Sequence, residues 1–190
     1  MSKKKKYALR HPLYAGGVRL QETRASSIRN WWARRWNESI ASKDLAGRAA
    51  RAHNYAMTGQ VVEISPERAV VQGLRKEPYR VKLVFRKPEG EARARIVAAL
   101  KAEPMMVSRL LSGDLPTEVE GLFKAEGFDL FPGGKLGEDV YDVTTSCTCP
   151  DYANPCKHSL AALIVLGEEV AWRPWRLLEF RGISMEELIA

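Results

Sequence analysis

The sequence has little cysteine, and the little it has lies in one short segment. Only three of its 190 residues are cysteines, and all three fall between Cys147 and Cys156. A disulfide framework needs an even number of cysteines spread along the chain, so this clustering favours metal binding instead. Thiols persist in a reducing compartment, and we therefore expect the protein to be cytoplasmic.

Long apolar runs are also missing. No stretch of the sequence approaches the roughly 18 apolar residues that a membrane-spanning helix requires. The basic residues Lys3–Lys6 near the start are not followed by the apolar segment that a secretory signal needs. The sequence thus predicts neither a membrane-spanning segment nor export.

Acidic residues are scarce in the first third of the chain. Residues 1–60 contain 13 Lys and Arg against 3 Asp and Glu, whereas residues 61–190 contain 17 against 20. Cationic surfaces bind phosphate backbones because counterions are released, so this asymmetry favours a nucleic-acid partner, with DNA the expected one. A solvated face that only improves solubility has the same composition and remains the alternative. The side chains predicted to contact nucleic acid are Arg29, Arg34, Arg35, Arg48, Arg51, Arg80, Lys82 and Lys157.

The usual signatures of catalysis are absent from the sequence. It contains no phosphate-binding glycine loop, no Gly-x-Ser-x-Gly and no His-Glu-x-x-His. No His-x-Glu precedes the cysteines, as a zinc deaminase requires. His11 and His53 stand alone, without a neighbouring nucleophile or acid. We therefore expect the protein not to be an enzyme.

The spacing of apolar residues predicts an α+β fold. Apolar side chains at every fourth position predict a helix over Ala25–Ser42, and we assign Trp32 and Trp36 to the core. A stacking surface for unpaired bases is the alternative role of this aromatic stripe. In the last of three strand-like runs, Arg80 and Lys82 alternate with apolar residues, which suits either a phosphate-binding face or an ordinary solvated one. Turn residues separate the runs and predict an antiparallel meander. The three predicted strands are Gln60–Ile64, Ala69–Leu74 and Tyr79–Phe85.

After Pro88 the pattern becomes helical. Helices are expected over Glu91–Ala102 and Met105–Leu111, and a third begins near Pro116, whose fixed backbone angle suits a first helical turn. A Pro-Gly-Gly turn at residues 132–134 follows these helices.

This turn is the predicted domain boundary. Before it, residues 1–134 form a basic N-terminal α+β region with a helix, a small antiparallel sheet and further helices. After it, residues 135–190 form a ββα-like metal module followed by C-terminal helices.

Four residues of this second region have the spacing of a metal site. The chain reads Cys-x-Cys, then six residues, then Cys-x-His. Three thiolates and one imidazole are a common tetrahedral zinc set. The predicted ligands are Cys147, Cys149, Cys156 and His158.

The flanking sequence places these ligands on suitable elements. A strand over Val140–Thr145 lets the first two cysteines point to the same side, and a helix expected to end at Gly167 begins at Cys156. Protein atoms fill all four positions, so zinc, the expected cofactor, is structural. An iron–sulfur cluster or free thiols beside a coincidental histidine remain alternatives. Lys157 could contact phosphate or compensate the excess negative charge of three thiolates around a dication.

This segment resembles the SWIM zinc finger family. The similarity rests on the order of the ligands, on Cys-Pro-Asp at residues 149–151 and on Pro-Cys-Lys-His at residues 155–158, and it covers about residues 139–167. The six-residue spacer is at the short end for the family. The resemblance implies a module that binds DNA or protein.

Segments outside the zinc module are similar to those of small prokaryotic SWIM proteins encoded beside Swi/Snf-type ATPase translocases. These segments are Gly17–Leu20, the tryptophan helix, Arg51–Gly59, Pro78–Val81 and Leu130–Pro132. The similarity implies a helicase or translocase partner.

Two functions follow from these observations. The first is a zinc-binding, non-catalytic DNA-binding accessory protein that acts with such a translocase. The second is a protein adaptor that docks to a Swi/Snf-type ATPase without touching DNA. The adaptor would use the C-terminal segment, where Trp172 and Trp175 flank a proline and a capping box predicts a short helix over Ser184–Ile189. Packing of the two tryptophans onto the zinc-site helix is the alternative.

Overall fold

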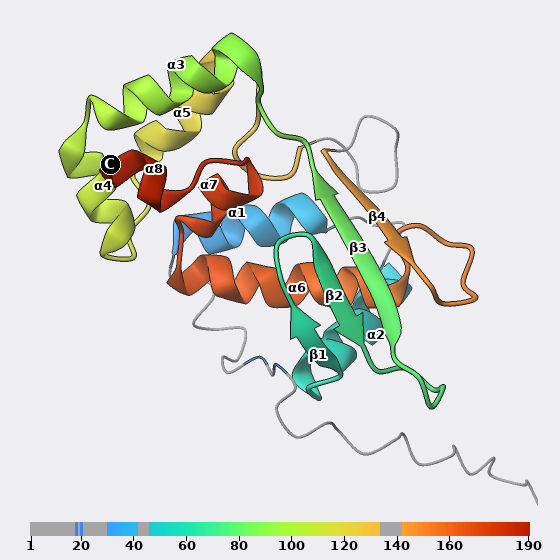
Figure 1. Ribbon diagram of the computed structural model, residues 1–190. Helices are drawn as coiled ribbons and strands as arrows, with labels where there is room; N and C mark the ends of the chain where they lie inside the picture. The colour runs from blue at the N-terminus through green and yellow to red at the C-terminus, as the bar shows by residue number, and fades with distance from the viewer. Residues whose placement is uncertain (1–17, 19, 21–29, 42–45, 134–141) are drawn as a thin grey trace, which may run out of the picture.

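The computed structural model describes residues 18, 20, 30–41, 46–133 and 142–190. These residues form eight helices and one four-stranded antiparallel sheet, which confirms the α+β class (Figure 1). Within the described ranges, no helix combines the length and the apolar composition that crossing a bilayer requires. The elements are, in chain order, α1 (Trp31–Ile40), α2 (Ala46–Met57), β1 (Val61–Ile64), β2 (Arg68–Val71), β3 (Tyr79–Phe85), α3 (Gly90–Lys101), α4 (Pro104–Leu111), α5 (Thr117–Ala125), β4 (Val143–Cys147), α6 (Lys157–Trp172), α7 (Arg176–Phe180) and α8 (Met185–Ile189).

The predicted meander is present, and a fourth strand completes it. The sheet order is β1-β2-β3-β4, with each neighbouring pair antiparallel. Strand β2 ends earlier than predicted because the buried side chain of Gln72 donates to the carbonyls of Gly73 and Arg75 and forms a turn there. Strand β4 pairs along β3, from Phe85 opposite Val143 to Val81 opposite the first cysteine of the metal site.

Helix α6 lies between the sheet and the N-terminal helices. It packs on one face of the sheet, while α1 and α2 pack on its other sides (Figure 1). It is therefore buried around most of its circumference, as a helix with little amphipathic character should be. The predicted core role of the α1 tryptophans is confirmed, because Trp32 and Trp36 are buried and donate to carbonyl oxygens of α6, at 3.1 and 3.0 Å.

The predicted end of α6 at Gly167 is wrong. The helix continues to Trp172, and Gly167 lies buried in its interior. A Cβ atom on this glycine would lie 2.5 Å from Cδ1 of Trp36, so the missing side chain permits close contact between α1 and α6. Gly167, which suggested a helix end in the sequence, is instead needed for the packing of two helices.

Among the described residues, no helix covers the other face of the sheet. Along β3 the residues alternate strictly between buried and exposed, and the exposed ones continue across the register into β2 and β4. We call this surface the open sheet face. Its exposed residues on these three strands are Arg68, Arg80, Lys82, Val84, Thr144 and Ser146.

One hydrophobic core joins the two predicted regions. Phe180 of α7 stacks on Phe85 of β3 with ring centroids 4.7 Å apart, and it also contacts Trp36 of α1. Strand β4 shares its sheet with β3 as well. The predicted boundary at residues 132–134 therefore does not separate two cores within the described chain.

A buried arginine ties the C-terminal helices to the rest of this core. The side chain of Arg181 is 1% exposed, and its guanidinium donates to three backbone carbonyls and one carboxylate. Its acceptors are the carbonyl oxygens of Leu130, Arg86 and Phe131 and the carboxylate of Asp142. A planar, five-donor group suits this many acceptors, and a shorter or monodentate cation does not.

We predict that Arg181→Leu lowers the free energy of unfolding by about 3–5 kcal/mol, because it leaves the largely buried carboxylate of Asp142 and several carbonyls without their donor. Urea unfolding followed by circular dichroism measures this. Arg75→Leu, at an exposed position in the turn between β2 and β3, is the control and should change stability by less than about 0.5 kcal/mol. Equal stability of the two variants would show that the buried network is not needed.

Candidate metal centre

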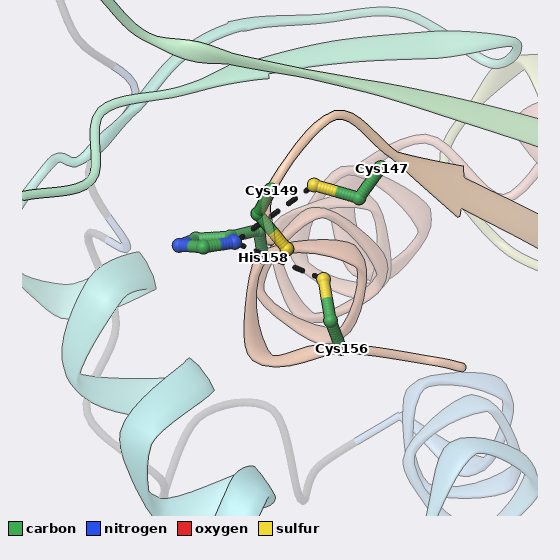
Figure 2. Close-up of side chains that lie close together, drawn as sticks. All are labelled: Cys147, Cys149, Cys156 and His158. Carbon is green, nitrogen blue, oxygen red and sulfur yellow. Dashed lines mark hydrogen bonds between the residues drawn. The ribbon is translucent and has the colours of Figure 1, made fainter. Parts of the chain in front are cut away.

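The four predicted ligands come together at one point between β4 and α6. Cys147 ends β4 and Cys149 follows two residues later, while Cys156 is the N-cap of α6 and His158 lies in its first turn. Their ligand atoms all lie within 4.8 Å of one another. Figure 2 shows the three sulfur atoms and the histidine ring converging from these separate segments.

The distances fit a tetrahedral zinc ion. Nδ1 of His158 lies 3.8 Å from Sγ of Cys147 and 3.8 Å from Sγ of Cys156. Zinc bonds of about 2.3 Å to sulfur and 2.0–2.1 Å to nitrogen at tetrahedral angles place these atoms about 3.6 Å apart. The ring presents Nδ1 to the sulfur atoms, and Nε2 points away from them (Figure 2). The residues present therefore fit the group with little adjustment.

The charge state of the thiols also favours a cation at this point. A hydrogen bond with Cys147 lowers the pKa of Cys156 to about 2, helped by His158 and the backbone N–H of Ser159 and opposed by burial. The same hydrogen bond, together with burial, raises the pKa of Cys147. Burial also raises the pKa of Cys149. Three thiols so close together resist full deprotonation, and a dication supplies the compensating charge.

Aromatic side chains hold the histidine ring in place. His158 is 1% exposed, and its ring meets those of Tyr55 and Tyr79 at centroid distances of 5.1 and 4.6 Å. Tyr79 in turn lies against Gly73, where an added Cβ atom would overlap its ring. Nε2 of His158 is buried and has no hydrogen-bond partner among the described residues. Packing therefore orients this ligand where many metal-bound histidines use a hydrogen bond.

A hydroxyl group supports the buried thiolate. Oγ of Ser159 lies 3.6 Å from Sγ of Cys156, and both residues are buried. The sequence did not point to Ser159, Tyr55 or Tyr79 as supports of the site. The two tyrosines contact His158 from segments about 80 and 100 residues away in the chain, and a single sequence has no local signal for such contacts. Ser159 lies only three residues after Cys156, so the helical spacing at the start of α6 could have indicated it.

The structure therefore contains a closed metal centre of three cysteines and one histidine. A family model for the SWIM zinc finger matches residues 139–167, which span all four ligands. The chain thus carries a SWIM zinc finger, as the sequence predicted, and zinc is its metal. When bound, zinc links the four side chains through its positive charge. It offers no open coordination position for a substrate, because protein atoms fill all four.

A relative extends the similarity beyond the finger. The uncharacterized protein Rv2102 of Mycobacterium tuberculosis (strain ATCC 25618 / H37Rv) is 32% identical over 179 residues. The match covers 92% of this chain and 63% of that protein, so the chain spans somewhat less than two thirds of the relative's length. No solved structure gave a significant match.

The predicted nucleic-acid residues fall on two separate surfaces. Arg80 and Lys82 are exposed on the open sheet face. Four others lie on the helical side, since α1 and α2 pack on α6 away from that face. Among the latter, the guanidinium of Arg35 lies 3.5 Å from the carboxylate of Glu120. The helical group comprises Arg34 and Arg35 on α1 and Arg48 and Arg51 on α2.

Two predicted residues belong to neither surface. Lys157 is half-buried as the first residue of α6, directly between two zinc ligands, which suits its alternative role in compensating thiolate charge. Arg29 lies outside the described residues. The alternation of polar and apolar residues along β3 predicted part of the open sheet face. Its continuation into β4 could not be predicted from the sequence, because it depends on pairing between distant segments.

We predict that purified protein contains one zinc ion per chain and that a strong chelator unfolds the region around β4 and the start of α6. The reason is that structural zinc binding is worth on the order of 10–16 kcal/mol, comparable to the stability of a domain. Elemental analysis and near-ultraviolet circular dichroism measure the two effects, and added zinc should reverse the second.

A matched pair of histidine variants provides the control. His158→Ala should lose the metal, whereas His53→Ala, at an exposed position of α2, should keep it. An unchanged near-ultraviolet spectrum after complete metal removal would contradict the structural role of the zinc.

Proposed function

We propose that this protein is a non-catalytic, zinc-stabilised accessory protein that binds DNA and acts with a helicase or translocase. The observation that carries the proposal is the pair Arg80 and Lys82, which project from the open sheet face next to the strand that ends in the zinc site. The closed coordination of the zinc supports a role without catalysis, because no position remains for an activated water.

The cations of the open sheet face are available to a ligand. Within the described part of the chain, neither Arg80 nor Lys82 has a carboxylate partner. Arg68 does pair with Glu63 at 3.2 Å, but both side chains are largely exposed, and such pairs contribute little. A polyanion could therefore bind these cations without breaking a strong ion pair within the protein.

Hydroxyl groups lie beside these cations. Ser146 of β4 is opposite Lys82 in the strand register, and Thr148 accepts a hydrogen bond from the backbone N–H of Arg80 at 3.0 Å. Arginine, lysine, serine and threonine supply most contacts to nucleic-acid backbones, and those contacts position the ligand without reading sequence. The face thus has the composition of a backbone-binding surface.

The translocase partner is likewise proposed. The resemblance of the flanking segments to SWIM proteins encoded beside Swi/Snf-type ATPases supports a translocase, and the basic first third of the chain supports nucleic acid.

We predict that the double variant Arg80→Gln/Lys82→Gln weakens duplex DNA binding and reduces the slope of log affinity against log salt by about two, since each lost phosphate contact removes about 0.9. Fluorescence anisotropy with a labelled duplex across a salt series measures both quantities. The control is Arg48→Gln/Arg51→Gln, which removes equal charge from the helical side. If only the control variant shows weaker binding and a smaller salt slope, the DNA binds the helical surface and not the open sheet face.

The adaptor function rests on a different feature. Trp172, at the end of α6, is 60% exposed, whereas Trp175 is half-buried and packs against the core. Exposed tryptophans are enriched in protein interfaces. The helices that follow are buried on their apolar sides, so deleting residues 168–190 would unfold the protein and would not isolate a docking surface.

If the adaptor function is correct, we expect Trp172→Ala to abolish co-purification with a Swi/Snf-type ATPase while the melting temperature stays within a few degrees. Met105→Ala serves as the control, because this α4 side chain is also exposed and apolar. If both variants retain the ATPase, Trp172 is not the docking residue.

A further inference from the structure

A polar hollow lies along the outer edge of β4, beside the zinc centre. Its volume is about 220 Å³, and we call it the β4 hollow. Two zinc ligands contribute to its wall, but Cys149 and His158 do not, so the hollow lies outside the metal tetrahedron and is not the space that the zinc fills. Its other lining residues include Ser146, Asp151, Tyr152 and Asn154.

The aromatic side chain of the hollow is available to a ligand. Tyr152, in the loop between the second and third cysteines, is fully exposed. The zinc holds both ends of this loop, because Cys149 and Cys156 are ligands on either side of it. The anchored backbone of this loop holds an exposed aromatic ring beside the hollow, and such a ring offers a flat surface on which a base can stack.

The polar groups of the hollow suit the edge of a nucleobase better than a phosphate. Oδ1 of Asn154 lies 2.5 Å from the hydroxyl of Thr145, which donates to it, and this contact leaves the amide NH₂ as a donor. Asp151 accepts from the backbone N–H of Ala153 with one oxygen, and its second oxygen is an acceptor. A carboxylate repels phosphate, whereas a donor beside an acceptor matches the hydrogen-bonding edges that bases present.

The hollow is continuous with the open sheet face. Ser146 lines the hollow and is also the register partner of Lys82, with Arg80 two residues further along β3. A strand of nucleic acid whose phosphates cross these cations would pass Ser146, which belongs to both the open sheet face and the hollow that Tyr152 lines. Bases in a duplex are stacked and paired, so only an unpaired base can enter.

We propose that the β4 hollow binds an unpaired nucleobase, stacked on Tyr152, while the adjoining phosphates lie on Arg80 and Lys82. This inference rests on the proposed function and makes it more specific, because it assigns the protein a preference for single-stranded over double-stranded DNA. The zinc then has a second role: it holds the loop that carries the stacking residue.

The test compares Tyr152→Ala, Tyr152→Phe and the zinc-loaded wild type, using a labelled single strand and the matching duplex. Because one stacked base is lost, Tyr152→Ala should bind the single strand about 5-fold to 150-fold more weakly than the wild type. Duplex binding should change by less than about twofold, and Tyr152→Phe should restore single-strand binding because it keeps the ring. Trp172→Ala, an exposed aromatic at the far end of α6, should bind like the wild type.

Several outcomes would overturn the inference. Single-strand binding by Tyr152→Ala that equals the wild type, or an equal loss for single strand and duplex, would exclude base stacking in the hollow while leaving DNA binding intact. Failure of the wild type to bind either form would reject the proposed function itself. Zinc content and melting temperature of each variant verify that the site is formed, which the exposure of Tyr152 leads us to expect.

Photocross-linking provides a readout that is independent of affinity. A single strand carrying one 5-iododeoxyuridine is irradiated with the wild-type protein, and the cross-linked peptide is identified by mass spectrometry. Attachment within the loop between Cys149 and Cys156 supports the inference. Attachment confined to α1 and α2 would overturn it.

Discussion

The link between the edge of the sheet and the start of the central helix is the constraint on which the site depends. Three thiolates and one imidazole draw the end of β4 and the first turn of α6 to a single point. Strand β4 has only five residues and the loop after it has no regular secondary structure, so a metal ion with a large binding free energy is an effective way to hold both against α6. The loop between Cys149 and Cys156 takes its position from the same four bonds.

The central helix transmits this constraint to the rest of the fold. Helix α6 is enclosed by the sheet and by α1 and α2, and its close contact with Trp36 needs a glycine at position 167. The same packing places the ring of His158 between two tyrosines from α2 and β3. The zinc finger is thus packed into the core with elements from the first half of the chain, and Arg181 binds the C-terminal helices to that core.

The layered arrangement also explains why charge is divided between two surfaces. In the part of the chain that the structure describes, helices cover one face of the sheet and none covers the other, so the cations of α1 and α2 lie apart from those of β3. In the sequence, both groups belong to one predicted set of nucleic-acid contacts. Only the layers separate them, and only the pairing of β4 with β3 brings Ser146 and the zinc-bound loop beside Lys82.

The sequence by itself determined the zinc ligands, the α+β class, strand β3 with its alternating faces, and the core role of the tryptophans, because these follow from spacing within a few residues. It did not determine the length of α6, helix α2 or the tyrosines around His158. The tertiary structure decided these features, since a glycine can end a helix or admit a neighbouring ring with the same local sequence. Which of the two occurs depends on Trp36, more than a hundred residues away in the chain.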